Sequence, residues 1–172
     1  MPNHIINEII FHNVNKEKQS ELLASLCNAE QKVDFEILVP IPLNVWMGSV
    51  GTRHEKAFRR TALDWSRDNW GTKWNAYSHK ENKATESTLI LTFETAWAPP
   101  YPWLAAVFNH FKIGFEHNWL DEGRERGIHG VFDWSKMNVF LGDPWTEIEA
   151  DDELQKHLHF LHWGCESFEE EA

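Results

Sequence analysis

The chain has 172 residues, enough for one domain with a sizeable core, and a formal net charge of −11 at neutral pH. Two cysteines are too few for a disulfide framework, and no apolar run reaches membrane-spanning length. These features exclude a disulfide-stapled secreted scaffold and a membrane-spanning protein, and we expect a protein of the reducing cytoplasm. Ten tryptophans are unusually many for this length.

The acidic charge lies mainly in the second half of the chain. Met1–Lys80 contains ten basic and nine acidic residues, whereas Glu81–Ala172 contains six basic and eighteen acidic residues. Carboxylates in excess repel the phosphates of nucleic acid and attract basic protein surfaces, and added salt weakens both effects. The sequence therefore favours a protein partner, except where a locally basic surface attracts nucleic acid.

The chain opens with a predicted strand, a helix and an extended segment. His4–His12 is apolar on both faces, as in the central strand of a sheet. Asn15 suits the N-cap of the helix that follows, whose leucines are spaced to form one buried face. Val33–Leu38 is expected to be a short strand or extended segment, which Pro40 and Pro42 end.

A loop and a second helix come next. The apolar loop Leu43–Gly51 is expected to expose Trp46 and Met47. A helix is predicted from about Arg53 to about Asn69. Gly71 follows it, and a glycine there takes the left-handed conformation that closes a helix.

The segment after this glycine is predicted to be a strand. In Lys73–Ser78, Trp74 and Ala76 share one face, so Trp74 is expected to be largely buried beside the second helix. Glu81–Glu86 is polar and is expected to be a loop.

The remaining elements follow from alternation and proline placement. Thr88–Thr95 alternates between apolar and polar residues, and Pro102 suits the first turn of the next helix. Ile113–Leu120 and Ile128–Trp134 alternate again. Near the end, acidic residues from Asp151 onward favour the start of a last, short helix.

This order of elements predicts an α+β fold: a ferredoxin-like antiparallel sheet with helices packed on one face. The domain is expected to span residues 1–135, with an inserted segment around residues 33–70. Residues 136–172 are expected to form an acidic C-terminal extension with a short helix. Two unrelated α–β layers are the alternative architecture.

Two tryptophan-containing motifs resemble a known family. They are Asn69-Trp70-Gly71-Thr72-Lys73-Trp74 and Phe93-Glu94-Thr95-Ala96-Trp97-Ala98-Pro99-Pro100. With Pro2-Asn3-His4 and the proline segment Phe35–Pro42, they resemble the YubB-type ferredoxin-like family of phage and plasmid proteins over about Asn3 to Trp134. The resemblance implies a ferredoxin-like domain from a mobile genetic element. The family has no established activity, so the resemblance implies no catalytic residues.

Basic and aromatic residues gather in the second helix and just after it. Such a combination tracks a phosphate backbone and stacks bases. The sequence therefore predicts an alternative, nucleic-acid-binding surface made by Arg53, Lys56, Arg60, Arg67, Lys73 and Tyr77. The simpler interpretation is a solvated helix face beside core tryptophans.

Two further sets of residues would suit enzymatic chemistry. Zinc needs three or four converging donors, and the C-terminal segment offers His159, His162 and Cys165, although their spacing matches no standard zinc motif. General acid–base catalysis needs paired carboxylates, which would come from Glu94, Glu116, Asp121 and Glu122. Surface histidines and solvated strand faces explain both sets more simply.

The function predicted first is a non-enzymatic accessory protein of a phage or plasmid. It would bind a host or element protein in the bacterial cytoplasm, without a cofactor and without a membrane. The acidic residues beyond Asp143 are expected to contribute to this binding, and mimicry of nucleic-acid phosphates is one way to do so. A nucleic-acid-binding module and a small metal-dependent hydrolase are the alternatives. Neither a Gly-x-x-x-x-Gly-Lys loop nor a Gly-x-Ser-x-Gly elbow occurs in the sequence.

Overall fold

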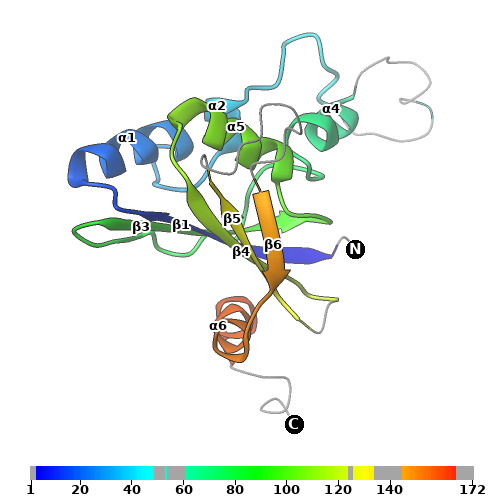
Figure 1. Cartoon of the computed structure of the whole chain (residues 1–172). Coiled ribbons are helices and arrows are strands. Elements are labelled where there is room, and N and C mark those ends of the chain that lie inside the picture. Colours follow the sequence, from blue (N-terminus) through cyan, green and yellow to red (C-terminus); the bar gives the residue numbers. More distant parts are fainter. Residues whose placement is uncertain (1–2, 49–52, 54–60, 124–125, 134–144, 166–172) are drawn as a thin grey trace.

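The computed structural model describes residues 3–48, 53, 61–123, 126–133 and 145–165 (Figure 1). The elements in chain order are β1 (His4–His12), α1 (Lys16–Leu26), α2 (Phe35–Leu38), α4 (Ala62–Asn69), β2 (Lys83–Ala84), β3 (Thr88–Ala96), α5 (Tyr101–Phe111), β4 (Phe115–Asp121), β5 (Ile128–Phe132), β6 (Trp145–Glu149) and α6 (Asp152–Trp163). None of these helices has the length and apolar character needed to cross a membrane.

The strands form one antiparallel sheet in the order β2-β3-β1-β4-β5-β6. β1 pairs with β3 on one side and with β4 on the other, so it is the central strand that its two apolar faces predicted. α1 connects β1 to β2 through an inserted segment, and α5 connects β3 to β4, which gives the first four strands the ferredoxin-like connection. The predicted α+β, ferredoxin-like fold class is confirmed, and β5 and β6 extend the sheet beyond β4.

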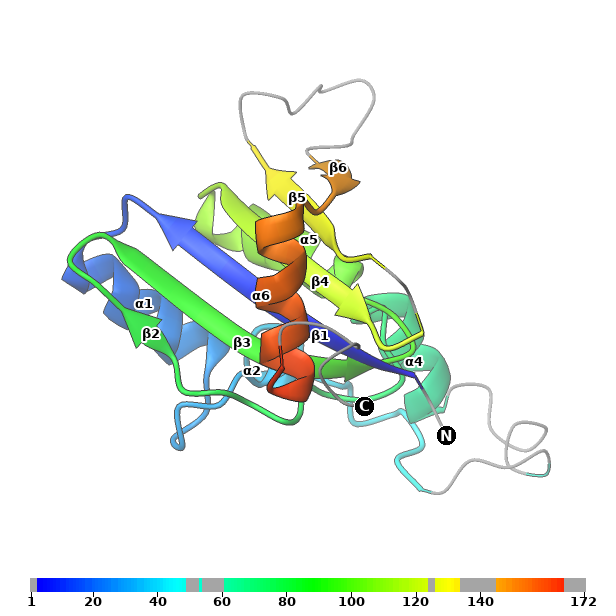
Figure 2. The same ribbon diagram turned by 90° about the horizontal axis from the view of Figure 1, so that it is seen from below.

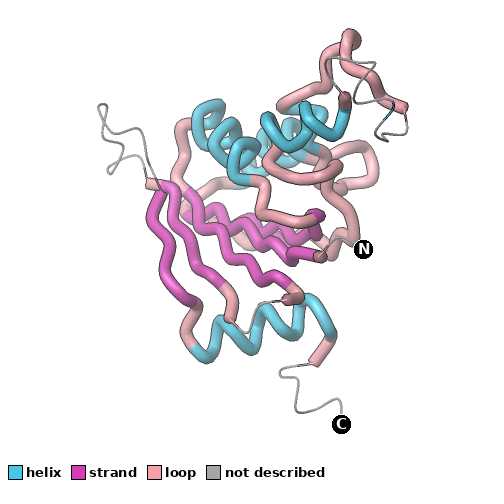
Figure 3. The backbone as a smooth tube through the Cα atoms, turned by 90° about the vertical axis from the view of Figure 1, so that its right-hand side faces the viewer, coloured by secondary structure: helices cyan, strands magenta, loops and turns pink. Residues whose placement is uncertain are grey.

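Helices lie on both sides of the sheet. α1, α2, α4 and α5 cover one face, and α6 crosses the other (Figures 1 and 3). The large core lies between the sheet and the four helices. At its centre, the rings of Phe35 and Trp103 are 4.5 Å apart, and Trp65 meets Trp70 edge to face at 5.2 Å.

α6 is attached to the opposite face by a small apolar cluster and two ion pairs. Leu158 and Leu161 pack on Ile6 of β1 and Leu120 of β4. Figure 2 shows α6 lying across the strands of the sheet. The ion pairs join His157 to Glu8 at 2.8 Å and His162 to Glu94 at 3.3 Å. The helix begins where the acidic run predicted, because the side chain of Asp151 accepts a hydrogen bond from the Leu154 N–H.

The segment after Val33 is a helix, so the prediction of an extended Val33–Leu38 is wrong. The side chain of Asp34 accepts a hydrogen bond from the Glu36 N–H at 3.0 Å and caps α2. The hydrogen bond that caps α2 therefore outweighs the preference of the β-branched residues in this segment for extended backbone.

The predicted strand Lys73–Ser78 is also absent from the described sheet, apart from one bridge between Tyr77 and Glu94. Its side chains bond to nearby backbone instead: the Thr72 hydroxyl donates to the Trp74 carbonyl at 2.6 Å, and Asn75 Oδ1 accepts from the Ala76 N–H at 2.9 Å. The edge strand is β2, inside the predicted loop Glu81–Glu86.

Candidate binding site

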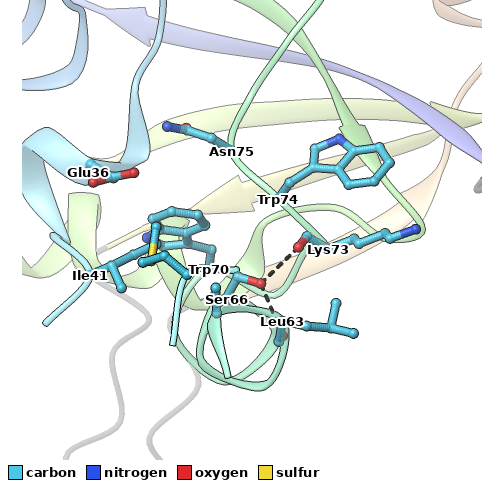
Figure 4. Close-up of a pocket in the computed structure, with 10 residues that line it drawn as sticks. Glu36, Ile41, Leu63, Ser66, Trp70, Lys73, Trp74 and Asn75 are labelled. Atoms are coloured by element: carbon cyan, nitrogen blue, oxygen red, sulfur yellow. Dashed lines mark hydrogen bonds between the residues drawn. The ribbon is translucent and has the colours of Figure 1, made fainter. Parts of the chain in front are cut away.

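A cavity of about 490 Å³ opens between α2, α4 and the segment that follows Gly71 (Figure 4). We call it the apolar hollow. The buried indole of Trp70 forms part of its wall, and apolar side chains dominate the lining. The lining residues are Glu36, Ile41, Met47, Ala62, Leu63, Ser66, Trp70, Lys73, Trp74 and Asn75.

The turn at Gly71 brings the two walls of the hollow together. Gly71 has φ +85°, and its N–H bonds to the Ser66 carbonyl at 3.0 Å, which closes α4 as the sequence predicted. The Ser66 hydroxyl then holds the returning chain, since it lies 2.9 Å from the Lys73 carbonyl oxygen (Figure 4).

Polar groups in the wall are already hydrogen-bonded within the protein. The Trp70 indole N–H donates to the Val39 carbonyl at 2.9 Å. The Asn75 side chain donates to Asp34 at 2.8 Å and accepts from the Phe35 N–H at 2.9 Å. With these groups occupied, the hollow presents mainly apolar surface to a ligand, while the charges of Glu36 and Lys73 lie at opposite sides of it (Figure 4).

A basic aromatic rim adjoins the hollow. The Lys73 ammonium lies 4.5 Å from the ring centroids of both Trp74 and Trp97, and the Arg67 guanidinium lies 4.6 Å from that of Trp97. Both indoles are about two-fifths exposed. Cations stacked on exposed rings are oriented without being neutralised, so the rim retains positive charge for a partner.

Trp97 is held in a strained conformation. Its φ is +77°, in the left-handed region that costs a residue other than glycine roughly 1–2 kcal/mol. Its N–H bonds to the Asn3 carbonyl at 3.0 Å, which fixes the turn. Strain of this kind gathers at binding sites, and here it places the indole under two cations.

Tyr77 lies at the far side of the rim from Arg67. Its ring meets that of Trp74 at 6.2 Å, and its hydroxyl donates to the Thr95 carbonyl at 3.1 Å and lies 2.7 Å from His4 Nδ1. Burial, with help from the nearby carboxylates Glu94 and Glu122, raises the pKa of Tyr77 above its usual value. The phenol is therefore neutral and anchored to the sheet.

The structure brings Arg67, Lys73 and Tyr77 together out of the six residues predicted to contact nucleic acid. Arg53 is helical and exposed, and Lys56 and Arg60 lie outside the described residues. Sequence reasoning did not assign Trp97 to the site, although a tryptophan between a strand and Pro99-Pro100 must lie in a turn. Contact with nucleic acid stays a prediction for this group.

Trp74 is 41% exposed, so its predicted burial is wrong. It was assigned to the core because it shares a face with Ala76 in a strand, and that strand does not form. Trp70 and Trp103 occupy the core instead, with 2% and 0% exposure.

The three predicted metal donors lie at the end of α6 and just after it. His162 pairs with Glu94, and the ring of His159 lies 4.8 Å from that of Trp163. Burial, and then the neighbouring His162, lower the pKa of His159. Cys165 follows Gly164, the C-cap of the helix. Within the described ranges no group of three or more such side chains is arranged to hold a metal ion, so metal binding stays a prediction.

Three of the four predicted carboxylates are held in separate contacts. Glu94 faces His162, Glu116 lies 3.1 Å from His12, and Asp121 accepts from the Gly123 N–H at 2.8 Å. Burial acts to raise the pKa of Glu94, but the hydrogen bonds from His162 and Ser78 and the charges of His162 and His4 bring it below its usual value.

Comparison with known proteins gives one match. Residues 73–161, just over half of the chain, match the family model described as the ferredoxin-like domain in Api92-like protein. No curated protein and no solved structure matches the chain. The matched residues include Lys73, Trp74 and Trp97 of the rim and all strands from β2 to β6. Because the match covers more than half of the sequence and agrees with the observed sheet, the chain belongs to the family of the ferredoxin-like domain in Api92-like protein.

Proposed function

We propose that this protein is a non-enzymatic binding module whose apolar hollow receives a large apolar side chain of another protein. The observation that carries the proposal is the concentration of exposed apolar residues around the hollow. Of the eight large apolar side chains exposed in the described residues, Met47 and Trp74 line the hollow, Trp97 belongs to the rim, and Ile37 and Trp46 are next in sequence to lining residues. Such patches on otherwise polar surfaces are typical of protein interaction sites.

The lining favours an apolar side chain over a nucleobase. A base is recognised by hydrogen bonds to its edge as well as by stacking. In the hollow, the polar groups of Ser66, Trp70 and Asn75 are engaged with the protein's own chain. A base inserted there would find only Glu36 and Lys73, at opposite sides of the hollow, to replace its hydrogen bonds to water, whereas an apolar side chain loses none.

The positive charge of the rim predicts which residue of the partner lies next to that apolar side chain. Lys73 and Arg67 stand at one border of the hollow and carry positive charge. A partner segment with an aspartate or glutamate beside its apolar residue would pair with them while the apolar residue enters. The proposed occupant is therefore an apolar residue followed or preceded by a carboxylate, on an exposed segment of another protein.

The biological setting is part of the same proposal. The two motifs that resemble the YubB-type family contain Gly71, Lys73, Trp74 and Trp97, which are the residues that shape the hollow and its rim. This coincidence supports an accessory protein of a phage or plasmid that binds a host or element protein in the cytoplasm.

The test is a selection of random twelve-residue peptides on the intact protein, followed by titration with tryptophan fluorescence. We expect peptides with a large apolar residue next to Asp or Glu. Leu63→Arg, which fills the hollow, and Lys73→Glu, which reverses the rim charge, should each abolish binding. The matched control Lys80→Glu changes the same charge at an exposed position outside the site and should bind as the parent does. Selected peptides that bind Leu63→Arg as well as the parent would refute the proposal.

A nucleic-acid-binding module remains the second candidate, because Arg67 and Lys73 are stacked on exposed tryptophans. Such a surface binds single strands by stacking and by phosphate contact, with strong salt dependence. A titration with an oligothymidylate at low and at physiological salt separates the two candidates. Binding that persists at physiological salt and is lost in Trp97→Ala would favour nucleic acid. Binding confined to low salt would favour a protein partner.

A further inference from the structure

A second cavity, of about 430 Å³, lies on the opposite face of the sheet beside α6. Its volume falls within the range of roughly 300–1,000 Å³ that is usual for small-ligand sites. Residues from six strands, from the N-cap of α6 and from its first half line it: Glu8, Ile10, Lys83, Ile90, Glu116, Asn118, His129, Ile148, Glu149, Asp151, Leu154 and His157. The proposed protein-binding function does not use this cavity.

Strand register places a row of side chains across the cavity. Glu8 of β1 is directly opposite Asn118 of β4, Asn118 is opposite His129 of β5, and His129 is opposite Ile148 of β6. Residues directly opposite each other in an antiparallel sheet share a face. The row therefore follows from strand pairing alone, and it begins at Glu8 on the central strand β1.

Hydrogen bonds link this row and fix which groups remain for a ligand. Asn118 donates from Nδ2 to Glu8 Oε2 at 3.2 Å, and its Oδ1 accepts from His129 Nδ1 at 2.6 Å. His157 Nε2 lies 2.8 Å from Glu8 Oε1. In the neutral ring of His129, Nε2 is consequently an acceptor. Each oxygen of the Glu8 carboxylate also keeps a second lone pair, so the row offers acceptors to a ligand.

The charges around the cavity also favour a ligand that donates hydrogen bonds and carries positive charge. Four carboxylates line it (Glu8, Glu116, Glu149 and Asp151), against Lys83 and His157, which pairs with Glu8. Glu8 is buried, with 3% exposure, whereas Glu149 is exposed. Aliphatic side chains complete the lining: Ile10, Ile90, Ile148 and Leu154. An anion is repelled by this set, and a strongly hydrated metal ion gains nothing from the aliphatic part.

We propose that this cavity binds an organic cation, namely an aliphatic chain that ends in a primary ammonium or a guanidinium group. The cation donates to Glu8 and to the carboxylates at the mouth, where positive charge and several N–H donors match the acceptors present. The aliphatic chain lies against the isoleucines and Leu154. This chemistry occurs in free alkylamines and in lysine or arginine side chains.

The experiment uses the isotope-labelled full chain and follows backbone amide shifts in NMR titrations at neutral pH. The probes are the pentylammonium ion, 1-pentanol and pentanoate, which share one chain length and differ in charge. We expect saturable shifts in β1, β4 and the start of α6 with pentylammonium, with at least tenfold weaker binding of the alcohol and none of the carboxylate. Equal binding of alcohol and ammonium would overturn the proposal, because the cation would not be recognised.

Two variants test the acceptors. Glu149→Gln, an exposed change that leaves the fold intact, should weaken pentylammonium binding by about threefold. Glu8→Gln should weaken it further, with thermal unfolding recorded alongside to show that the variant is folded. Glu17→Gln removes the same charge in the first turn of α1, on the other face of the sheet, and should bind as the parent does. Unchanged affinity in both cavity variants would refute the assignment.

A fourth probe, N-acetyl-lysine amide, distinguishes the two sources of the cation. If it binds at least as tightly as pentylammonium, with the same shifted residues, the cation comes from a basic polypeptide. If pentylammonium binds and the lysine derivative does not, the ligand is a free amine. If neither binds, the proposal is wrong.

Discussion

Gly71 is the residue on which the geometry of the hollow depends. It has φ +85°, and an added Cβ would lie 2.5 Å from Pro102 Cδ and 3.3 Å from the Pro99 carbonyl oxygen. Both a positive φ and a close approach to the start of α5 therefore require glycine. The close approach of Gly71 to Pro99 also joins the end of α4 to the turn that contains Trp97.

We predict that Gly71→Ala lowers the free energy of unfolding by roughly 2–3 kcal/mol, from backbone strain together with the clash. Gly164→Ala is the matched comparison, since Gly164 has φ +80° but nothing lies within 4 Å of an added Cβ. It should cost only about 1 kcal/mol. Denaturant unfolding of the two variants measures the difference, and equal losses would show that the proline contact is unimportant.

The tryptophans differ in role, which stability measurements can separate. Trp103 is fully buried and packs on Phe35, so Trp103→Ala should cost roughly 3–5 kcal/mol. Trp74 is 41% exposed, and Trp74→Ala should cost less than about 1 kcal/mol. In the peptide titration, however, Trp74→Ala should lose most of the binding. A large loss of stability in Trp74→Ala would mean that this side chain belongs to the core.

At the scale of elements, alternation in the sequence predicted which residues of β3 and β4 share a face. Leu91 and Phe93 of β3, and Phe115 and Trp119 of β4, are buried on the side of the four helices, as the period of two indicated. The two apolar faces of β1 indicated no single buried side, and Ile6 and Ile9 are buried on opposite faces. β5 was predicted over Ile128–Trp134, and the structure describes it as far as Phe132; Trp134 lies outside the described residues.

The elements that sequence reasoning missed depend on contacts made elsewhere in the fold. β2 has only two residues and exists because it pairs with Ile90 and Leu89 of β3. β6 has an exposed, acidic sequence and pairs with β5 along Ile128–Phe132. The hollow could not be predicted for the same reason. Its wall combines residues from α2, α4 and the turn after Gly71, and no local sequence pattern links them.

α6 is the element whose attachment should respond to pH. The hydrogen bond to Glu8 raises the pKa of His157, against the opposing effect of burial, and the charge of Glu8 adds to the rise. A raised pKa in the folded state means that the pair stabilises α6 fully below the unfolded pKa of about 6.5 and that this contribution is lost as pH rises through the folded value. Because the His157 side chain is 39% exposed, the effect is only roughly 0.5 kcal/mol.

We predict that the opening free energy of α6, measured by amide hydrogen exchange corrected for intrinsic rates, is higher at pH 6 than at pH 8.5. His157→Gln should remove the difference or reverse its sign, because the lowered pKa of His159 in the same helix acts in the opposite direction. A local measurement is needed because burial lowers the pKa of His117 to about 3. A lowered histidine pKa affects stability in the opposite direction to the raised pKa of His157. The contribution of His117 therefore makes the global free energy of unfolding fall as pH drops below about 6.5. An α6 opening energy that rises with pH would contradict the prediction.

At the scale of the whole molecule, a basic rim and an acidic cavity lie on opposite faces of the sheet. The side of the four helices carries the basic rim of Arg67 and Lys73, and the side of α6 carries an acidic cavity beside Glu149 and Asp151. This division agrees with the charge split in the sequence, where residues 81–172 hold eighteen acidic and six basic residues. A partner that approaches the rim is therefore not subject to the full field of the acidic face, since physiological salt screens charges beyond about 8 Å.

The acidic C-terminus gives the last prediction. Deleting Glu166–Ala172 removes four carboxylates and leaves every described helix and strand intact. The melting temperature should not change, whereas the truncated chain should bind polylysine more weakly than the full chain and with a smaller dependence on salt, because fewer charges take part. Replacing the four glutamates by glutamine at full length is the control for chain length and should give the same result. Unaltered polylysine binding in both variants would show that the attraction resides in the cavity carboxylates. Tight oligothymidylate binding by the intact chain at physiological salt, abolished by Arg67→Glu, would instead show that the basic rim governs partner choice.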